Sequence, residues 1–155
     1  NKAQMTHLLD AHESKAERAP SNLRKHFDLI RKTVGMASLK DTAERLLALP
    51  TEGDEWLATA VDTFRRGSPT SAALAWELQH RCRHRSLADV FRIEYNVAIS
   101  CCAAHDFAEG VRALLIDKDR SPKWDPPTLA AVEQKFIESH FRDHHDGAHP
   151  LSDWR

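Results

Sequence analysis

Apolar residues recur every three or four positions along most of the 155-residue chain. This spacing places apolar side chains on one face of a helix and polar side chains on the other. Gly and Pro residues separate these stretches, with Gly110 as the exception, and no stretch alternates as a half-buried strand does. The pattern therefore predicts an all-α protein of about seven helices. Its clearest series are Phe27, Ile30 and Val34; Leu39, Ala43, Leu46 and Leu47; Trp56, Ala60 and Phe64; Leu87, Val90 and Phe91; and Phe107, Val111, Leu114 and Leu115.

Helix starts and stops are also visible in the sequence. A short oxygen-bearing side chain can accept a free backbone N–H at a helix start, and an acidic residue three positions later favours the helix dipole. Gly67 has the character of a helix stop, and Ser68-Pro69 that of the next start. Three predicted starts pair a cap with an acid: Ser38 with Asp41, Ser86 with Asp89, and Asp106 with Glu109.

The composition is that of a globular protein, with 41% hydrophobic and 29% charged residues. The formal net charge of −1 argues against a globally basic nucleic-acid-binding protein. The apolar runs are too short to span a membrane, so we expect no membrane segment. The cysteines are Cys82, Cys101 and Cys102, an odd number that predicts reduced thiols rather than a disulfide framework.

The first residue is Asn rather than Met, and a helical pattern follows directly, without the apolar core of a signal peptide. This pattern comprises Met5, Leu8, Leu9, His12 and Ala16. We therefore expect the chain to be a piece of a longer polypeptide or a processed product.

The end of the chain is rich in histidine, and His140 and His144 would share a helix face if the preceding helix continued. The spacing of a catalytic zinc site with its adjacent Glu is absent. We therefore expect a solvated, frayed tail over residues 142–155 and no metal site. The candidate ligands in this region are His140, Asp143, His144, His145, Asp146 and His149.

A basic run over residues 80–85 could contact RNA phosphates or an acidic partner. The run contains no aromatic platform, and cations also suit the carboxyl end of a helix, so we expect no nucleic-acid binding. Asp117 and Asp119, like Asp143 and Asp146, are expected to be solvated surface pairs. Gly110, within a helical pattern, is expected to allow a neighbouring helix to approach closely.

A longer stretch carries a resemblance. It runs from Phe91-Arg-Ile-Glu94-Tyr95 through His105-Asp106-Phe107-Ala-Glu109-Gly110-Val111-Arg112-Ala113 to Ser121-Pro122-Lys123-Trp124. Ser68-Pro69-Thr70-Ser71, the segment 30–49 and Ser139-His140-Phe141 add to it. Together, residues 22–141 resemble the C-terminal region of 3-hydroxyisobutyryl-CoA hydrolases, which belong to the crotonase (enoyl-CoA hydratase/isomerase) superfamily.

The resemblance implies hydrolysis of 3-hydroxyisobutyryl-CoA to the free acid and CoA, a step of valine breakdown. In that family an N-terminal core of β-β-α turns supplies an oxyanion hole and the catalytic acids. This chain lacks such a core, so no catalytic residue is assigned within it, and we expect it to be inactive alone. No cofactor is implied, because coenzyme A is part of the substrate.

The resemblance also suggests roles for single residues. Related crotonases place a lysine that follows the Glu-Gly-x-x-Ala motif near CoA. The corresponding residue here is Lys118, and the resemblance implies that its ammonium lies beside the CoA phosphates. We interpret Asp106 and Glu109 as helix caps, Arg112 as the partner of a neighbouring carboxylate, and Trp124 as a loop anchor.

The resemblance assigns residues 1–141 to a helical region that packs on the core and self-associates, followed by the tail at 142–155. It implies a mitochondrial location if the source is eukaryotic and a cytoplasmic one otherwise. Two alternatives remain open: a crotonase-like structural subunit, for example of a mitochondrial ribosome, and a hydratase or isomerase of the same superfamily.

Overall fold

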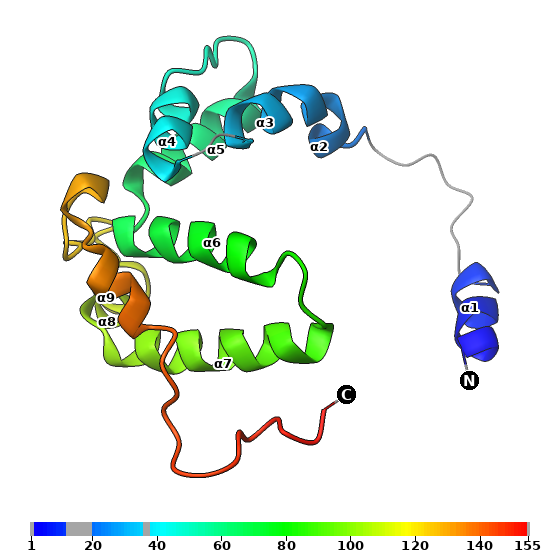
Figure 1. Cartoon of the computed structure of the whole chain (residues 1–155). Coiled ribbons are helices and arrows are strands. Elements are labelled where there is room, and N and C mark those ends of the chain that lie inside the picture. Colours follow the sequence, from blue (N-terminus) through cyan, green and yellow to red (C-terminus); the bar gives the residue numbers. More distant parts are fainter. Residues whose placement is uncertain (1, 12–19, 36–37, 155) are drawn as a thin grey trace.

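The computed structural model describes residues 2–11, 20–35 and 38–154, and every regular element in these ranges is helical (Figure 1). This confirms the all-α prediction. Because His12 and Ala16 lie outside the described residues, the predicted opening helix is seen only as far as Ala11. The elements are α1 (Lys2–Ala11), α2 (Asn22–Lys25), α3 (Phe27–Val34), α4 (Leu39–Leu47), α5 (Glu55–Arg66), α6 (Pro69–Cys82), α7 (Leu87–Ala103), α8 (His105–Val111), the π-helical turn η1 (Arg112–Ile116), the 3₁₀ turn η2 (Leu129–Ala131) and α9 (Gln134–Ser139).

The described residues thus contain nine α-helices, against the seven predicted. One extra boundary falls at His26, where α2 ends and α3 begins. The His26 ring stacks on Trp56 at 5.1 Å between centroids, and its Nε2 lies 3.0 Å from Asp54 Oδ2. Periodicity along the chain does not show this break, because it accompanies packing against residues about thirty positions away.

The predicted helix starts at Ser38, Ser68 and Ser86 are confirmed. Each hydroxyl accepts a hydrogen bond from the backbone N–H three residues later, at Asp41, Ser71 and Asp89 respectively. Gly67 is the C-cap of α5, as predicted. These caps separate α5 from α6 and place the start of α6 beside α8.

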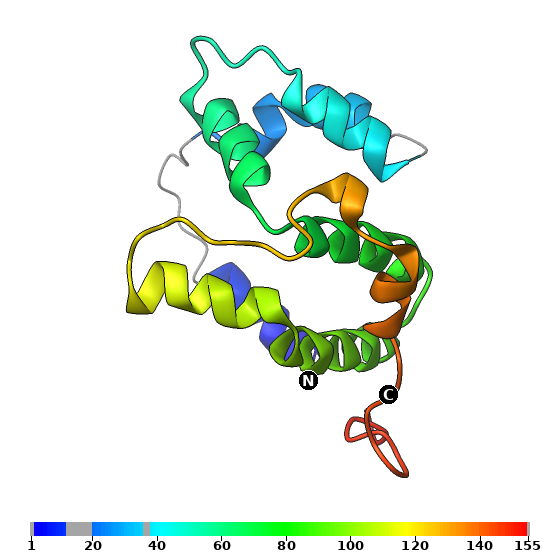
Figure 2. The same ribbon diagram turned by 90° about the vertical axis from the view of Figure 1, so that its left-hand side faces the viewer.

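The buried core lies where α6, α7 and α9 meet. Helices α6 and α7 form an antiparallel pair, and α9 lies across one end of it (Figures 1 and 2). Ile137 of α9 is the most buried large side chain, with 1% of its surface exposed. The core residues are Ala73, Leu74, Val97 and Ile137, with Leu39, Leu78, Cys101, Leu129, Val132 and Phe141 packed around them.

Much apolar surface remains uncovered. The chain exposes 11993 Å², whereas a compact monomer of its mass exposes about 7,900 Å². Along α8 and η1, four large side chains are more than half exposed: Phe107, Leu114, Leu115 and Ile116. We call these four residues the α8–η1 face. Within the described residues no helix is both long enough and apolar enough to cross a membrane.

Residues 143–154 are mostly exposed, as expected of a solvated tail, but they contact α7, which corrects the expectation that the tail is frayed. The Arg92 guanidinium donates to the carbonyl oxygens of Leu151, Ser152 and Trp154. The Trp154 ring lies edge-on to Phe91, with centroids 5.4 Å apart. Because Arg92 and Phe91 are consecutive, α7 offers a polar and an aromatic contact to the same segment.

Candidate functional site

The segment 105–126, which carried much of the family resemblance, folds as a helix followed by a loop that returns onto it. Asp106 links three parts of this structure. Its Oδ2 accepts a hydrogen bond from Ser68 Oγ at the start of α6, and its Oδ1 accepts one from the Asp125 N–H at 2.9 Å. The prediction that Asp106 caps the helix is wrong, because the N-cap of α8 is Ala104. The carboxylate instead holds the loop and α6 together.

Arg112 is the centre of a cluster of carboxylates. Its Nε and Nη2 donate to both oxygens of Glu109 at 2.8 Å, which is the bidentate geometry that suits guanidinium and carboxylate. Its Nη1 lies 2.7 Å from Asp117 Oδ2 and 2.7 Å from Asp119 Oδ2. The predicted role of Arg112 as a structural partner is confirmed. Asp117 and Asp119 are exposed, as expected, but both are ion-paired rather than merely solvated.

Glu109 is buried and also accepts the Lys123 N–H at 2.7 Å. It therefore fastens the returning loop as well as Arg112, and does not cap the start of α8 as predicted. The hydrogen bonds from Arg112, followed by that from Lys123 N–H, lower the pKa of Glu109 from 4.5 to about 2. The same guanidinium lowers the pKa of Asp119. A carboxylate with so low a pKa is a poor general base, so the cluster is structural.

Trp124 anchors the returning loop, as predicted. Its Nε1 donates to the Arg66 carbonyl at the end of α5 at 2.8 Å. Its ring faces Gly110, where an added Cβ would lie 3.4 Å from Trp124 Cη2. Gly110 therefore accommodates a loop side chain and not the neighbouring helix that we expected.

A mainly apolar cleft of about 410 Å³ lies between the start of α6 and the α8–η1 segment. Leu74, Cys101, Gly110 and Trp124 contribute to its wall. Thr70 Oγ1 and His140 Nε2 are buried and lack a hydrogen-bond partner among the described residues. Burial raises the pKa of the Cys101 thiol, which opposes formation of a nucleophilic thiolate. The cleft suits an apolar group. The Ser68 hydroxyl and the Asp106 carboxylate to which it donates also line it, but the hydroxyl accepts the Ser71 N–H as the cap of α6, so this pair is engaged in the fold.

Lys118 follows η1 in an exposed loop and adopts a left-handed backbone conformation, with φ at 57°. The flanking Asp117 and Asp119 carboxylates are both paired with Arg112. In the described part of the chain, no carboxylate forms an ion pair with the Lys118 ammonium. It is therefore available to an anionic group from outside.

Helix α6 ends at Cys82, within the basic run at 80–85. This confirms the interpretation that these cations lie at the carboxyl end of a helix. Arg81 is engaged within the fold, because it lies 3.2 Å from Glu77, pairs with Glu138 and stands 3.9 Å over the Phe141 ring. Arg83, His84 and Arg85 remain exposed in the turn before α7. The run thus presents fewer free cations than its sequence suggests.

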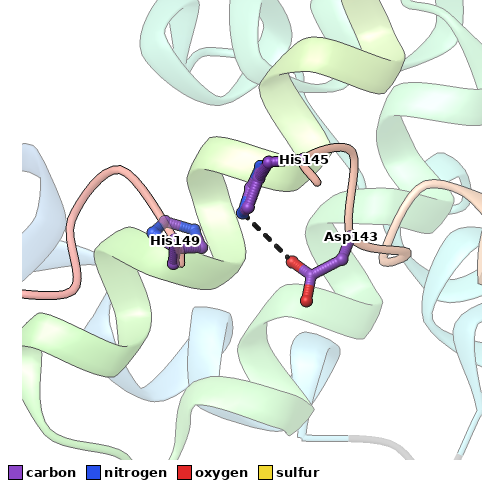
Figure 3. A group of neighbouring side chains, drawn as sticks. All are labelled: Asp143, His145 and His149. Atoms are coloured by element: carbon purple, nitrogen blue, oxygen red, sulfur yellow. Dashed lines mark ion pairs between the residues drawn. The ribbon is translucent and has the colours of Figure 1, made fainter. Parts of the chain in front are cut away.

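The histidine-rich end divides into three environments. His140 is buried beside α9, and since α9 ends at Ser139, it does not share a helix face with His144. His144 Nε2 lies 2.6 Å from Ser100 Oγ. Asp143, His145 and His149 come together, with one potential ligand atom each and all three atoms within 4.8 Å of one another (Figure 3). Sequence spacing pointed away from a metal site, because this grouping depends on how the segment turns over α7.

Comparison with known proteins gives a consistent picture. A family model described as enoyl-CoA hydratase/isomerase matches residues 1–141. The mitochondrial 3-hydroxyisobutyryl-CoA hydrolase of Danio rerio is 34% identical over 137 residues, which are 86% of this chain and 35% of that protein. The Homo sapiens protein of the same name is 33% identical over 131 residues, 84% of this chain and 33% of that protein. The chain thus spans about a third of the length of these curated relatives.

Two crystal structures share the fold. A carnitinyl-CoA dehydratase from Mycobacterium thermoresistibile has a TM-score of 0.72 and 28% identity, over 90% of this chain and 38% of that one. An enoyl-CoA hydratase from Rhodobacter sphaeroides 2.4.1 has a TM-score of 0.70 and 28% identity, over 90% of this chain and 42% of that one. The helical arrangement is therefore found in proteins named for more than one reaction on CoA esters.

Proposed function

The chain belongs to the enoyl-CoA hydratase/isomerase family, and from this premise we propose that it is the helical C-terminal part of an acyl-CoA thioester hydrolase. The proposed reaction converts 3-hydroxyisobutyryl-CoA and water to 3-hydroxyisobutyrate and CoA. The names of the curated relatives support this substrate over other CoA esters. We propose a mitochondrial location if the source is eukaryotic and a cytoplasmic one otherwise.

The observation that carries this proposal is the uncovered α8–η1 face. Phe107, Leu114, Leu115 and Ile116 are each more than half exposed, although the first three line the cleft. Apolar surface of this kind is normally buried against a partner. A catalytic core of the kind expected from the resemblance would cover it, and would supply the oxyanion hole and the acids. By this proposal the 155 residues alone do not hydrolyse the thioester, and the reaction needs no metal or redox cofactor.

We further propose that Lys118 contacts the CoA phosphates. Its ammonium is exposed, and the acids beside it are ion-paired with Arg112. An ammonium binds phosphate as a compact point charge, so it would contribute to binding rather than to the chemical step. The expected signature is a raised KM with little change in kcat.

A chimera tests the hydrolase proposal. Residues 1–141 would replace the matching segment of the Danio rerio hydrolase, and the chimera and the 155-residue chain alone would be assayed for CoA release. We expect turnover by the chimera and none above the blank by the chain alone. A chimera that folds but releases no CoA would contradict the hydrolase proposal. Hydrolysis by the 155-residue chain alone would overturn the proposal that the catalytic groups lie in a separate core.

Lys118 is tested in the hydrolase chimera with Lys118→Ala and the matched control Lys135→Ala, an exposed lysine on α9. We expect Lys118→Ala to raise KM for the CoA ester several-fold, with KM for the corresponding pantetheine ester unchanged, since that ester lacks the nucleotide phosphates. Equal KM values in both variants would remove the phosphate contact.

The structural-subunit alternative draws less support from the structure. Arg81, the first arginine of the basic run, is held by Glu77, Glu138 and Phe141. We therefore retain the enzyme proposal, with charge reversal of Arg83 and Arg85 as the test of RNA binding. Salt-sensitive RNA binding that is lost in this variant would favour the alternative.

A further inference from the structure

We propose that Asp143, His145 and His149 form a binding site for a divalent transition-metal ion such as Zn²⁺. One carboxylate oxygen and two imidazole nitrogens lie within 4.8 Å of one another (Figure 3). All three residues follow residue 141, where the match to the family model ends. The inference therefore does not rest on the proposed thioesterase function.

The spacing of two ligands already suits a metal. His145 Nε2 lies 3.3 Å from Asp143 Oδ1. Zn–N and Zn–O bonds of about 2.0–2.1 Å at tetrahedral angles separate two ligand atoms by roughly 3.3 Å. The widest separation within the group, up to 4.8 Å, has to close by roughly 1.5 Å, which is within reach of small side-chain rotations.

Both ring nitrogens of His149 have hydrogen-bond partners, and these partners define its tautomer. The Leu151 N–H donates to Nδ1 at 3.0 Å, so Nδ1 is the unprotonated nitrogen and Nε2 carries the hydrogen. Nε2–H then donates to the Arg92 carbonyl at 3.3 Å. Metal-bound histidines commonly orient themselves by such a bond from the second nitrogen. A metal at Nδ1 would replace only the Leu151 contact.

The other two ligands are also positioned by α7. Asn96 Nδ2 donates to Asp143 Oδ1 at 2.9 Å. The His145 ring lies edge-on to Tyr95, with centroids 5.8 Å apart. His145 Nε2 is buried and has no hydrogen-bond partner among the described residues, and it lies 3.3 Å from the Asp143 carboxylate. A buried nitrogen in this state is destabilising, and coordination would satisfy it.

The donor set decides the class of ion. Two imidazoles and one carboxylate favour Zn²⁺, Co²⁺, Ni²⁺ or Cu²⁺ over Mg²⁺ or Ca²⁺, which prefer oxygen donors. Three protein ligands leave one tetrahedral position for water. Because the ligands come from residues 143–149 and their orienting partners from α7, the bound ion would fasten this segment to that helix.

The test titrates the metal-stripped 155-residue chain with Zn²⁺ against a chromogenic chelator, with Co²⁺ absorption and thermal unfolding as parallel readouts. We expect one ion per chain, a micromolar or lower Kd, and a Zn²⁺-dependent rise in the unfolding midpoint. His145→Ala and Asp143→Asn should each weaken binding by about tenfold or more and abolish this rise. His84→Ala, in the turn before α7, is the matched control and should bind as the wild type does.

Unfolding midpoints measured without metal separate folding from binding. Because His145 makes no hydrogen bond within the described part of the chain, His145→Ala should keep its metal-free midpoint within a few degrees of the wild type. No Zn²⁺ binding to the wild type would overturn the proposal. Wild-type affinity in both His145→Ala and Asp143→Asn would overturn it as well, since it would place any bound ion on other histidines.

Discussion

The indole ring of Trp124 covers Gly110, so a residue in the returning loop occupies the space that a side chain on α8 would need. A Cβ at Gly110 would meet Trp124 Cη2 at 3.4 Å, which is an ordinary van der Waals contact. A single methyl group therefore fits, and a branched side chain does not. This geometry gives graded predictions for substitutions at Gly110.

Gly110→Ala should leave stability unchanged or raise the free energy of unfolding by up to about 1 kcal/mol, because Ala favours the helix over Gly. Gly110→Leu should lower it by about 1–3 kcal/mol, because the added atoms displace Trp124. Urea unfolding followed by far-ultraviolet circular dichroism measures both. Equal stability in the two variants would mean that the ring does not restrict this position.

Glu109 should make the fold sensitive to acid. Its pKa in the folded chain is about 2, against the usual 4.5, so its contribution is complete above pH 4.5 and is lost as pH falls toward 2. We expect Glu109→Gln to be less stable than the wild type at neutral pH and to lose less stability than the wild type on acidification. Unfolding free energies measured from neutral pH down to about pH 3 test this.

Glu52→Gln, at an exposed loop position, is the matched control for that series. It should follow the wild-type pH profile throughout. Parallel profiles for the wild type and Glu109→Gln would show that Arg112 and the Lys123 N–H do not hold this carboxylate in solution.

Ile137 should be the most sensitive position of the core. It is 1% exposed and joins α9 to α6 and α7. We expect Ile137→Ala to lower the free energy of unfolding by about 2–5 kcal/mol and Ile137→Val by about 0.5–1.5 kcal/mol. Chemical unfolding of the wild type and of both variants measures these losses. A loss below about 0.5 kcal/mol for the alanine variant would place the core elsewhere.

The α8–η1 face should drive self-association of the isolated chain. Its four large apolar side chains have no cover in the described structure, and such surfaces associate in water. Light scattering at increasing concentration should show a mass above that of one chain. Leu115→Glu together with Ile116→Glu should restore a monomer, whereas Leu87→Glu, at an equally exposed apolar position on α7, should not.

A monomeric wild type at high concentration would contradict this prediction. Equal dissociation by Leu87→Glu would also contradict it, because association would then depend on general hydrophobicity and not on this face.

The local features of the fold were predictable from sequence, and the non-local ones were not. The caps at Ser38 and Ser86 involve a residue and its third neighbour, so the sequence pattern contains all the information needed. Asp106 offers the same local signal, yet its partners are Ser68 and the Asp125 N–H, which only folding brings close. The break at His26 has the same origin, since its ring packs on Trp56.

The candidate sites follow the same rule. The carboxylates that pair with Arg112 lie within seven positions of it, and the structural role predicted for Arg112 is confirmed. The grouping of Asp143, His145 and His149 depends on contacts with Tyr95, Asn96 and Arg92 of α7, which lie 47 to 57 residues earlier in the chain. No short-range pattern carries that information, and for this reason the segment was first interpreted as a solvated tail.

Arg92 binds residues 151–154 through their backbone atoms. All three of its contacts there are to carbonyl oxygens, and every residue type carries that group. Substitutions at 151–153 therefore keep the carbonyl oxygens that accept these hydrogen bonds. No other side chain can donate to three acceptors in the way that the Arg92 guanidinium does. Substitutions at 151–153 should therefore cost little stability, whereas a substitution of Arg92 removes all three of these contacts at once.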